Sequence, residues 1–429
     1  MLEEQRLNIM QSYLDRPVDS LFKLRSVFHK WFKYEDETFL DLCLAVMVHT
    51  HWLKDKDLTP LWLFISAPSG DRKSETIRAF ETAENAILVN QITENSLVSG
   101  WKKQAKNDLA PKLNRKCALT YDFGQFLKMN GEQKGKIWSQ MRSAFDGYVI
   151  RHTGSGVDTA YKGLRWNWIL GTTPLIDGEL IMKDELGTRE LMFKMSDENI
   201  EENIEKIQQK VWENQNDKEV MRLELTLAVN SFMDSWRKRN VGFDDVQVSE
   251  ETKSEIFLYA RFMALLRANA EVDPYTGELT SFVHPEKPTR NLEQLKGLFL
   301  ALKSLSPCYT DKLALKRLES ITQSSICEIR LAVLKELIKN RDLSEQYVPV
   351  GLGTLRKRLK LGAKTITREL MILAQLEFVD YIEEGHQGTQ GEFKSRKWFI
   401  NTDENNKKII DFVLKEGNDN AEKVISREA

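Results

Sequence analysis

The chain has 429 residues, which is enough for two or three domains. Charged residues make up 29% of it and hydrophobic residues 41%, a balance typical of soluble globular proteins. The net charge of −2 excludes a uniformly basic protein, so any surface that binds nucleic acid must be local. The sequence has no signal-peptide pattern and no apolar run of 18 residues, and we therefore expect a cytoplasmic protein with no membrane partner.

The first half of the chain predicts a helical lead-in and then an α/β domain. Residues 1–58 are typical of helices, including a nearly all-apolar helix at residues 39–48. Apolar runs then alternate with helical patterns; they predict strands at residues 61–66, 86–90, 116–121 and 166–170, and helices at residues 74–83 and 132–145. Such alternation is typical of a mostly parallel sheet, so we predict an α/β core at residues 59–196.

The second half predicts a helical segment and a smaller last domain. Residues 197–305 start with an acidic, solvated helix and continue with helices at residues 224–239, 251–270 and 291–303. Residues 311–402 combine three helices with two strands around a glycine-rich tip, at residues 325–340, 353–359, 363–377, 378–383 and 394–400. This order is typical of a winged helix-turn-helix domain. We expect the polar tail at residues 403–429 to be frayed.

The strand-turn-helix pattern at residues 61–80 carries the most information about function. Lys73 and Ser74 open the helix, and the turn before them consists of Ala67, Pro68, Ser69, Gly70, Asp71 and Arg72. In a phosphate-binding loop, backbone N–H groups and the helix dipole hold the phosphates, a lysine bridges the β and γ oxygens, and a hydroxyl binds Mg²⁺. Ala67 and Arg72 replace two glycines of the full pattern, so an ordinary surface turn is the alternative. We expect Arg72 to adopt a right-handed helical backbone and to crowd the phosphates without backbone strain.

Three later features could complete a nucleotide site. The strand at residues 116–121 is followed by Asp122, a position suited to an acid that holds Mg²⁺ through water. The strand at residues 166–170 leads to Thr172 and Thr173, whose hydroxyls could orient water or contact the γ-phosphate. Arg189, at an expected helix or loop start, could reach the γ-phosphate of a neighbouring subunit. Each feature alone is also compatible with an ordinary strand end or a surface arginine.

In this order, the phosphate loop, the acidic strand, the threonine-ended strand and the arginine resemble the AAA+ ATPases. Within that class, the chain is similar to the helicase-like ATPases carried by phages, plasmids and integrated elements, which are related to the MCM clade. The resemblance covers about residues 40–300 and also rests on residues 91–101, 121–127, 140–147, 171–174, 186–189 and 288–295. Loops of the MCM type also lack the glycine before the lysine.

The resemblance implies a ring of identical subunits, expected to be a hexamer, that binds ATP and Mg²⁺ and acts on single- or double-stranded DNA. It implies a replication role in a phage or mobile element, with replication proteins as further partners. Lys73 and Ser74 would contact phosphate and Mg²⁺, Asp122 would take the family's second acidic position, and Thr172 or Thr173 would be sensor 1. Arg189 would be the arginine finger, and Arg290 would be sensor 2, in cis or in trans.

Two basic regions are predicted to contact DNA. The stretch at residues 147–165 predicts a hairpin with a Gly-Ser-Gly tip, and in the family such a hairpin lines the central pore. Its Arg151, His152 and Lys162 would then contact phosphates without reading sequence. The second region is the predicted winged helix, where basic and hydroxyl side chains gather on the turn, the recognition helix and the wing: Arg356, Lys357, Arg358, Lys364, Thr365, Thr367, Arg368, Arg396 and Lys397. A plain solvent hairpin and a protein-binding winged helix are the alternatives.

One departure from the family pattern keeps a second reading open. The glutamate that usually follows the acid and activates the attacking water is Phe123 here, and Asp146 or Gln125 are the candidates to replace it. The chain could therefore be a nucleotide-binding scaffold that does not hydrolyse ATP and acts as a DNA-binding initiator, loader or regulator. A sensor ATPase of a defence system is a third reading, which the sequence does not separate from replication.

Overall fold

The structure is a computed structural model, which describes residues 2–32, 37–68, 72–99, 107–152, 158–178, 189–195, 212, 218–271, 273, 279–341, 346–388 and 391–414. The chain divides into two compact units. The first contains residues 1–256 and 293–321, and the second contains residues 257–292 and 322–429. Within the described ranges, no helix has both the length and the apolar character needed to cross a membrane.

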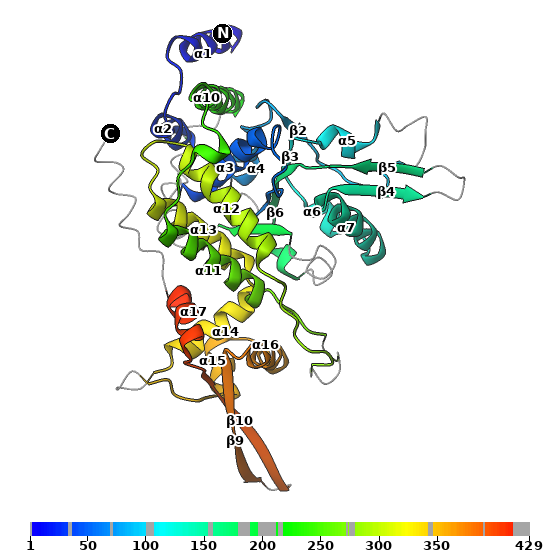
Figure 1. Cartoon of the computed structure of the whole chain (residues 1–429), viewed down its shortest axis with the longest axis vertical. Helices are drawn as coiled ribbons and strands as arrows, with labels where there is room; N and C mark the ends of the chain where they lie inside the picture. Colours follow the sequence, from blue (N-terminus) through cyan, green and yellow to red (C-terminus); the bar gives the residue numbers. More distant parts are fainter. Residues whose placement is uncertain are drawn as a thin grey trace. The chain divides into compact units, whose positions relative to one another are not determined.

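The first unit is built on a five-stranded parallel sheet with the order β2-β3-β6-β1-β7 (Figure 1). Its strands are β1 (Trp62–Ser66), β2 (Ala86–Leu88), β3 (Cys117–Thr120), β6 (Asn167–Thr172) and β7 (Glu190–Lys194). The predicted α/β fold with a parallel sheet is confirmed, and four strands lie at the predicted apolar runs. The fifth strand, β7, is absent from the prediction.

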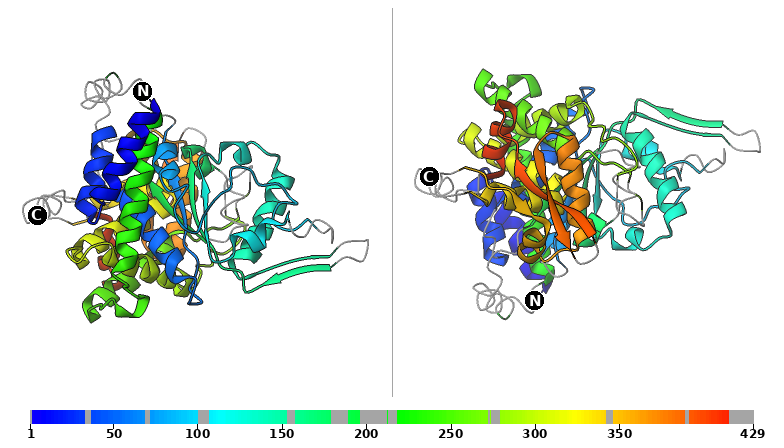
Figure 2. Two further views of the ribbon diagram at one scale, coloured as in Figure 1. Left: turned by 90° about the horizontal axis from the view of Figure 1, so that it is seen from above. Right: turned by 90° about the horizontal axis from the view of Figure 1, so that it is seen from below.

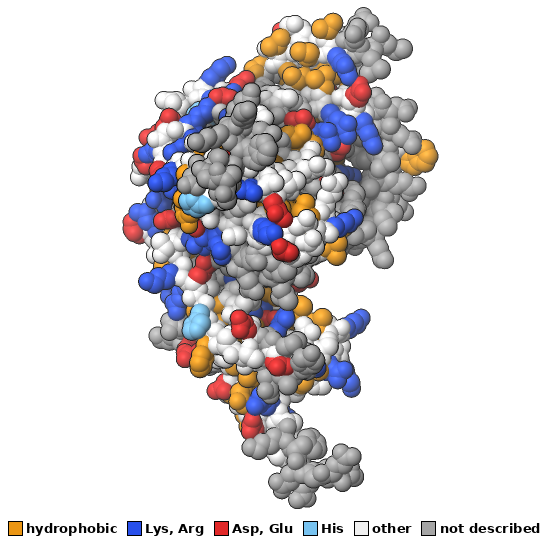
Figure 3. All heavy atoms as spheres, turned by 90° about the vertical axis from the view of Figure 1, so that its right-hand side faces the viewer, with side chains coloured by type: hydrophobic (Ala, Val, Ile, Leu, Met, Phe, Trp, Pro, Cys, Tyr) orange, Lys and Arg blue, Asp and Glu red, His pale blue; other side chains and the backbone are white. Residues whose placement is uncertain are grey.

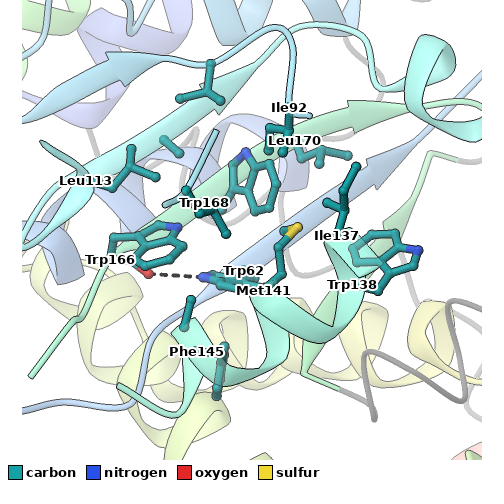
Figure 4. Close-up of a cluster of buried hydrophobic side chains, with 14 of the residues drawn as sticks. Trp62, Ile92, Leu113, Ile137, Trp138, Met141, Phe145, Trp166, Trp168 and Leu170 are labelled. Carbon is teal, nitrogen blue, oxygen red and sulfur yellow. Dashed lines mark hydrogen bonds between the residues drawn. The ribbon is translucent and has the colours of Figure 1, made fainter. Parts of the chain in front are cut away.

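Helices pack on both faces of this sheet. On one face, alternate side chains of the central strands, including Trp62 and Trp168, form a buried cluster with α7 (Gly131–Phe145) (Figure 4). Trp62 Nε1 donates to the Trp166 carbonyl at 3.1 Å in this cluster. Asn167 precedes Trp168 in β6 and therefore faces the opposite side, where α3 (Thr38–Trp52) and α4 (Lys73–Arg78) contact the sheet.

A buried polar cluster joins α3 to the sheet. The Asn167 amide nitrogen donates to the Val46 carbonyl at 3.1 Å and to Thr50 Oγ1 at 2.8 Å, and it lies 3.0 Å from His49 Nδ1. Burial lowers the pKa of His49 to about 3. His49 is therefore neutral at pH 7. Since α3 is buried along nearly its whole length, its sequence is apolar without a helical period.

A second buried cluster centres on Asp41, whose carboxylate is fully buried. It accepts hydrogen bonds from Arg25 at 2.8 Å, from the Tyr309 hydroxyl at 2.8 Å and from Arg317 Nε at 3.2 Å. These donors come from α2 (Leu21–Trp31), from the loop after α12 (Thr289–Ser304) and from α13 (Asp311–Ser325). Asp41 therefore ties together segments that are far apart in the sequence.

Three further helices lie in predicted helical segments: α1 (Leu2–Asp15), α10 (Lys218–Lys238) and α11 (Glu250–Leu266). Two short helices, α5 (Leu109–Leu113) and α6 (Gly124–Leu127), have no prediction of their own, and short 3₁₀ turns lie at Pro174–Gly178 and Phe243–Asp245. Leu7, Met10 and Leu14 of α1 are exposed, and Figure 3 shows hydrophobic side chains gathered at the end of the molecule where α1 lies. The predicted acidic helix after residue 196 falls almost entirely outside the described residues.

The predicted hairpin is confirmed. Strands β4 (Tyr148–His152) and β5 (Asp158–Lys162) pair antiparallel, apart from the main sheet, and the hairpin projects away from that sheet in both views of Figure 2. The predicted Gly-Ser-Gly tip lies outside the described residues. At the base, Gly147 has φ +98°, a conformation that strains any residue with a Cβ and therefore favours glycine.

The second unit contains helices and a small antiparallel sheet. The helices are α14 (Glu328–Lys339), α15 (Leu352–Leu359), α16 (Ala363–Gln375) and α17 (Glu404–Leu414); the sheet has the order β8-β10-β9, with β8 (Val350–Gly351), β9 (Val379–Gly388) and β10 (Gly391–Ile400). Three helices and two strands thus follow the predicted order, and the strands extend over most of the predicted glycine-rich tip. The prediction of a frayed tail was wrong for residues 404–414. These residues form α17, whose Ile409, Phe412 and Val413 are buried.

Candidate functional site

The candidate site lies at the carboxyl ends of β1, β6 and β3. Ser66 pairs with Thr172 in register, and the Ala67 N–H donates to the Thr172 carbonyl at 3.3 Å. The Phe123 N–H donates to the Gly171 carbonyl at 2.9 Å, which fixes the end of β3 against β6. The chain leaves β1 toward β2 on one side and leaves β6 toward β7 on the other, so β1 and β6 flank a topological switch point. Open parallel sheets bind ligands at such points.

Lys73 is the first residue of α4 and is 6% exposed. Its Nζ donates to the Ala67 carbonyl at 3.0 Å and more weakly, at 3.5 Å, to the Pro68 carbonyl. The ammonium group therefore contacts the first two residues of the predicted phosphate-binding turn. Ser69, Gly70 and Asp71 of that turn lie outside the described residues.

Arg72 corrects one expectation from the sequence. Its backbone has φ 51° and ψ −3°, in the left-handed region, where we expected a right-handed helical conformation. The reason is that the chain must turn sharply to enter α4 at Lys73. A left-handed backbone favours glycine, the residue of the full pattern, and an L-residue there costs about 1–2 kcal/mol. The Arg72 guanidinium lies 5.6 Å from the centre of the Phe32 ring.

Ser74 and Asp122, the two predicted metal ligands, bond to backbone and not to each other. Ser74 Oγ donates to the Tyr121 carbonyl at 3.2 Å, and Tyr121 directly precedes Asp122. Asp122 is exposed, and its Oδ1 accepts the Gly124 N–H at 2.8 Å. Both side chains are therefore anchored at the end of β3.

Thr172 and Thr173 are among the residues whose buried polar atoms have no hydrogen-bond partner in the described part of the chain. Thr172 is fully buried at the end of β6, and neither Oγ1 has a partner among the described residues. Buried hydroxyls are normally hydrogen-bonded, and each unsatisfied one costs on the order of 1–3 kcal/mol. A ligand or water at this edge would satisfy both groups.

A contact that the sequence did not reveal joins α10 to the helix after the loop. Arg222 donates two hydrogen bonds to the Glu75 carboxylate, at 2.8 and 2.6 Å. Its hydrogen bonds and charge lower the pKa of Glu75. The residues are 147 positions apart, so no local pattern could have indicated this pair. It fixes α10 directly beside Lys73 and Ser74.

Arg189, the predicted finger, directly precedes β7, and the residues before it lie outside the described part of the chain. Its side chain is 8% exposed and binds the Asp146 carboxylate through Nε at 3.2 Å and Nη2 at 2.6 Å. The guanidinium also lies 5.8 Å from the centre of the Phe145 ring. This arginine is therefore held within its own chain. Arg290, the predicted sensor 2, belongs to the second unit and pairs with Glu286 at 3.4 Å.

Phe123 occupies the position of the missing glutamate as a core residue. It is 3% exposed and stacks on Phe126, with ring centres 4.3 Å apart. Of the two candidate replacements, Asp146 is bound by Arg189, and Gln125 accepts a hydrogen bond from Gln91 at 3.3 Å. A cavity of about 170 Å³ opens beside Asp122, with these two glutamines in its wall.

The hairpin separates its predicted DNA-contacting residues between two faces. His152 and Lys162 are exposed and share one face with Tyr148 and Ile150, which are 46% and 45% exposed. Arg151 lies on the other face, where its guanidinium donates to Asn95 Oδ1 and, at 2.9 Å, to the Val98 carbonyl. This placement does not favour the predicted phosphate contact of Arg151.

The predicted DNA-binding cations of the second unit are largely paired with acids. Arg358 binds Glu336, Arg368 binds Glu369, Arg396 binds Glu383 and Lys397 binds Glu384, at distances between 2.8 and 3.2 Å. Thr365 and Thr367 are half-buried on α16, and Lys364 is exposed. Arg356 and Lys357 are exposed on α15, with no ion-pair partner within the described ranges.

Comparison with known proteins adds no identification. No protein-family model matches the chain, and no curated protein sequence matches it.

Proposed function

We propose that the first unit is an AAA+ nucleotide-binding core. The chain would form a ring and couple ATP hydrolysis to translocation, unwinding or remodelling of DNA, in the replication of a phage or mobile element. One observation carries the proposal: Lys73, Thr172 and Asp122 lie at the carboxyl ends of three adjacent parallel strands. The switch point between β1 and β6 is where this topology favours a phosphate ligand.

The residues at this edge are suited to bind a nucleoside triphosphate. The unpartnered hydroxyls of Thr172 and Thr173 need hydrogen-bond partners, which phosphate oxygens or an attacking water supply. Lys73 presents a buried ammonium group bonded to the Ala67 and Pro68 carbonyls, and phosphate oxygens are stronger acceptors than carbonyls. No cluster of three or more His, Cys, Asp or Glu occurs in the part of the chain that the structure describes. A Mg²⁺ site of this class needs only one hydroxyl and one carboxylate.

Each residue has a defined task in this proposal. Mg²⁺, when bound, would neutralise charge on the β and γ phosphates, and Ser74 and Asp122 would hold it, Asp122 through water. Lys73 would exchange its carbonyl partners for phosphate oxygens. Thr172 would orient the attacking water or the γ-phosphate. Arg189 would act on the nucleotide of the neighbouring subunit, which requires its release from Asp146.

Two surfaces support DNA as the partner. The hairpin face that carries Tyr148, Ile150, His152 and Lys162 combines an aromatic ring with a cation on a projecting element, as in surfaces that bind single strands without sequence preference. The second unit has the helix and strand order of a winged helix, in which α16 would be the recognition helix. Arg356 and Lys357 are the cations there best suited to contact phosphates, since acids neutralise most of the others.

The test is steady-state ATP hydrolysis by the purified protein, with and without single- and double-stranded DNA. We expect DNA-stimulated turnover that Lys73→Ala abolishes and that Lys408→Ala, a change of an exposed lysine on α17, leaves intact. Turnover at the wild-type rate in Lys73→Ala would refute the assignment of the loop. A measurement of the mass in solution with and without ATP tests the ring.

A specific observation favours one alternative. Phe123 is packed into the aromatic core where a catalytic carboxylate is expected, and Arg72 carries backbone strain at the loop. Both features suit a scaffold that binds nucleotide without hydrolysing it and acts on DNA through the second unit. Nucleotide binding and tight duplex binding, without hydrolysis at any DNA concentration, would establish this function.

A further inference from the structure

The covered face of the β4-β5 hairpin is bonded to one particular segment of the first unit, at residues 91–99. Arg151 of β4 donates to Asn95 Oδ1 and to the Val98 carbonyl at 2.9 Å. Tyr161 of β5 donates its hydroxyl to Asp108 Oδ2 at 2.9 Å, and Asp108 Oδ1 accepts the Ser99 N–H at 2.9 Å. Strand β4 is therefore bound to this segment directly, through Asn95 and Val98, and β5 is bound to its last residue, Ser99, through Asp108.

The groups that make these bonds are well placed to hold position. Asp108 is 2% exposed, so its carboxylate depends on the hydrogen bonds from Ser99 and Tyr161. Burial and the bond to Asp108 raise the pKa of Tyr161 to about 12, which keeps its hydroxyl a donor at neutral pH. Arg151 binds oxygens of Asn95 and Val98, three positions apart, and this fixes the local turn as well as the strand.

The other end of the same segment, at Gln91, lies near Asp122 at the carboxyl end of β3. Gln91 donates to Gln125 Oε1 at 3.3 Å, and Gln125 belongs to α6, which begins two residues after Asp122. The cavity of about 170 Å³ beside Asp122 lies between this stretch and α6, so side chains there have room to move. In the middle of the segment, Gln140 of α7 donates to the Glu94 carbonyl at 3.0 Å.

We propose that residues 91–99 form a coupling arm that transmits changes at Asp122 to the hairpin, and that Arg151 and Tyr161 are positioning residues of the hairpin and not DNA ligands. This role rests on the proposed function, because it presupposes a ligand at Asp122 and DNA on the exposed face. The exposed face would meet the DNA through Tyr148 and Lys162, while the covered face reports to the nucleotide site.

The first test compares Arg151→Ala with Lys162→Ala by anisotropy of a labelled single-stranded oligonucleotide at several salt concentrations. The affinity falls with salt, and each lost phosphate contact makes the slope of log K against log salt less steep by about 0.7 for single strands. We expect this decrease for Lys162→Ala and an unchanged slope for Arg151→Ala. A decrease in Arg151→Ala equal to that in Lys162→Ala would mean that Arg151 contacts phosphate, which would overturn the proposal.

The second test measures ATP turnover of the same variants. Arg151→Ala should keep basal turnover while the stimulation by DNA falls to about the basal level, because ligand and DNA are bound but no longer coupled. Arg151→Lys, which can still donate to one oxygen, should restore part of the stimulation. Full stimulation in Arg151→Ala would refute the coupling role.

The third test works even if the protein does not hydrolyse ATP or bind DNA. In the protein without ligands, amide hydrogen exchange of β4 and β5 should become about tenfold faster in Arg151→Ala and in Tyr161→Phe, and less so in Arg151→Lys. Exchange in β1 and β6 should not change. Unchanged exchange in the hairpin would disprove the anchoring itself, whereas absent turnover with faster exchange would count against the proposed ATPase alone.

Discussion

Arg72 allows the strain at the phosphate loop to be measured directly. Its left-handed backbone, with φ 51°, costs an L-residue about 1–2 kcal/mol, and glycine avoids most of that cost. Glycine also has more freedom in the unfolded chain, which offsets about 0.5–1 kcal/mol. Arg72→Ala is the matched control, because it removes the guanidinium and its contact with Phe32 but keeps the Cβ. We therefore expect Arg72→Gly to be more stable than Arg72→Ala by about 1 kcal/mol.

The assay is unfolding by urea and by heat, where 1 kcal/mol corresponds to a shift in Tm of about 2–4 °C for domains of 150–250 residues. Equal stabilities of the two variants, or a more stable alanine variant, would refute the argument from backbone strain. The same two variants also distinguish the effect of backbone strain on nucleotide affinity from the effect of side-chain crowding. If the guanidinium crowds the phosphates, both variants should bind a fluorescent ATP analogue more tightly than the wild type by similar factors. A gain with glycine alone would assign the effect to the backbone.

Three further changes test the core and the site. Asp41→Ala should destabilise the first unit by about 3–5 kcal/mol in urea unfolding, because it removes the buried carboxylate that Arg25, Tyr309 and Arg317 share, and a loss below about 1 kcal/mol would contradict this. The folded pKa of His49 is about 3 and its ordinary value is 6.5, so the unfolded state binds more protons between these values. Stability should fall by about 1.4 kcal/mol per pH unit below about pH 6.5, and His49→Gln should remove that part of the slope in unfolding curves at pH 7, 6 and 5. Arg189→Ala should keep ATP binding and lose turnover, whereas loss of binding would argue against a finger. Asp146→Asn should keep ATP binding and lower turnover, because the Asp146 carboxylate released by Arg189 would act on the attacking water, and unchanged turnover would exclude that role.

The sequence predicted elements where local patterns were strong. Four strands were evident because buried parallel strands are continuous apolar runs, and α7 was evident from its period. The strand β7 was not, because its five residues begin and end with charged side chains and its partner β1 lies more than 120 residues away. The helix α17 was hidden by polar composition, although its apolar residues have helical spacing.

The candidate site shows the same division between local and distant information. The phosphate loop is a local motif, so Lys73 and Ser74 could be named from the sequence alone. The conformation of Arg72 could not, since the entry into α4 is fixed by packing of the helix on the sheet. The pairs Arg222–Glu75 and Arg189–Asp146 join residues 147 and 43 positions apart, and only the folded chain brings such residues together.

In the proposed function, the residues that would bind the nucleotide are at their expected positions, whereas the residue that would activate the attacking water is not. Lys73, Ser74 and Thr172 lie at the carboxyl ends of β1, β3 and β6, where the proposed function puts the triphosphate, whereas the position after Asp122, where it expects a glutamate, is filled by the core residue Phe123. A base for water must therefore come from outside the β3 turn. Asp146 carries a carboxylate, and releasing Arg189 to a neighbouring subunit would leave that carboxylate unpaired. Subunit contact could thus supply the finger and free an acid in one movement, which makes assembly itself a condition for turnover.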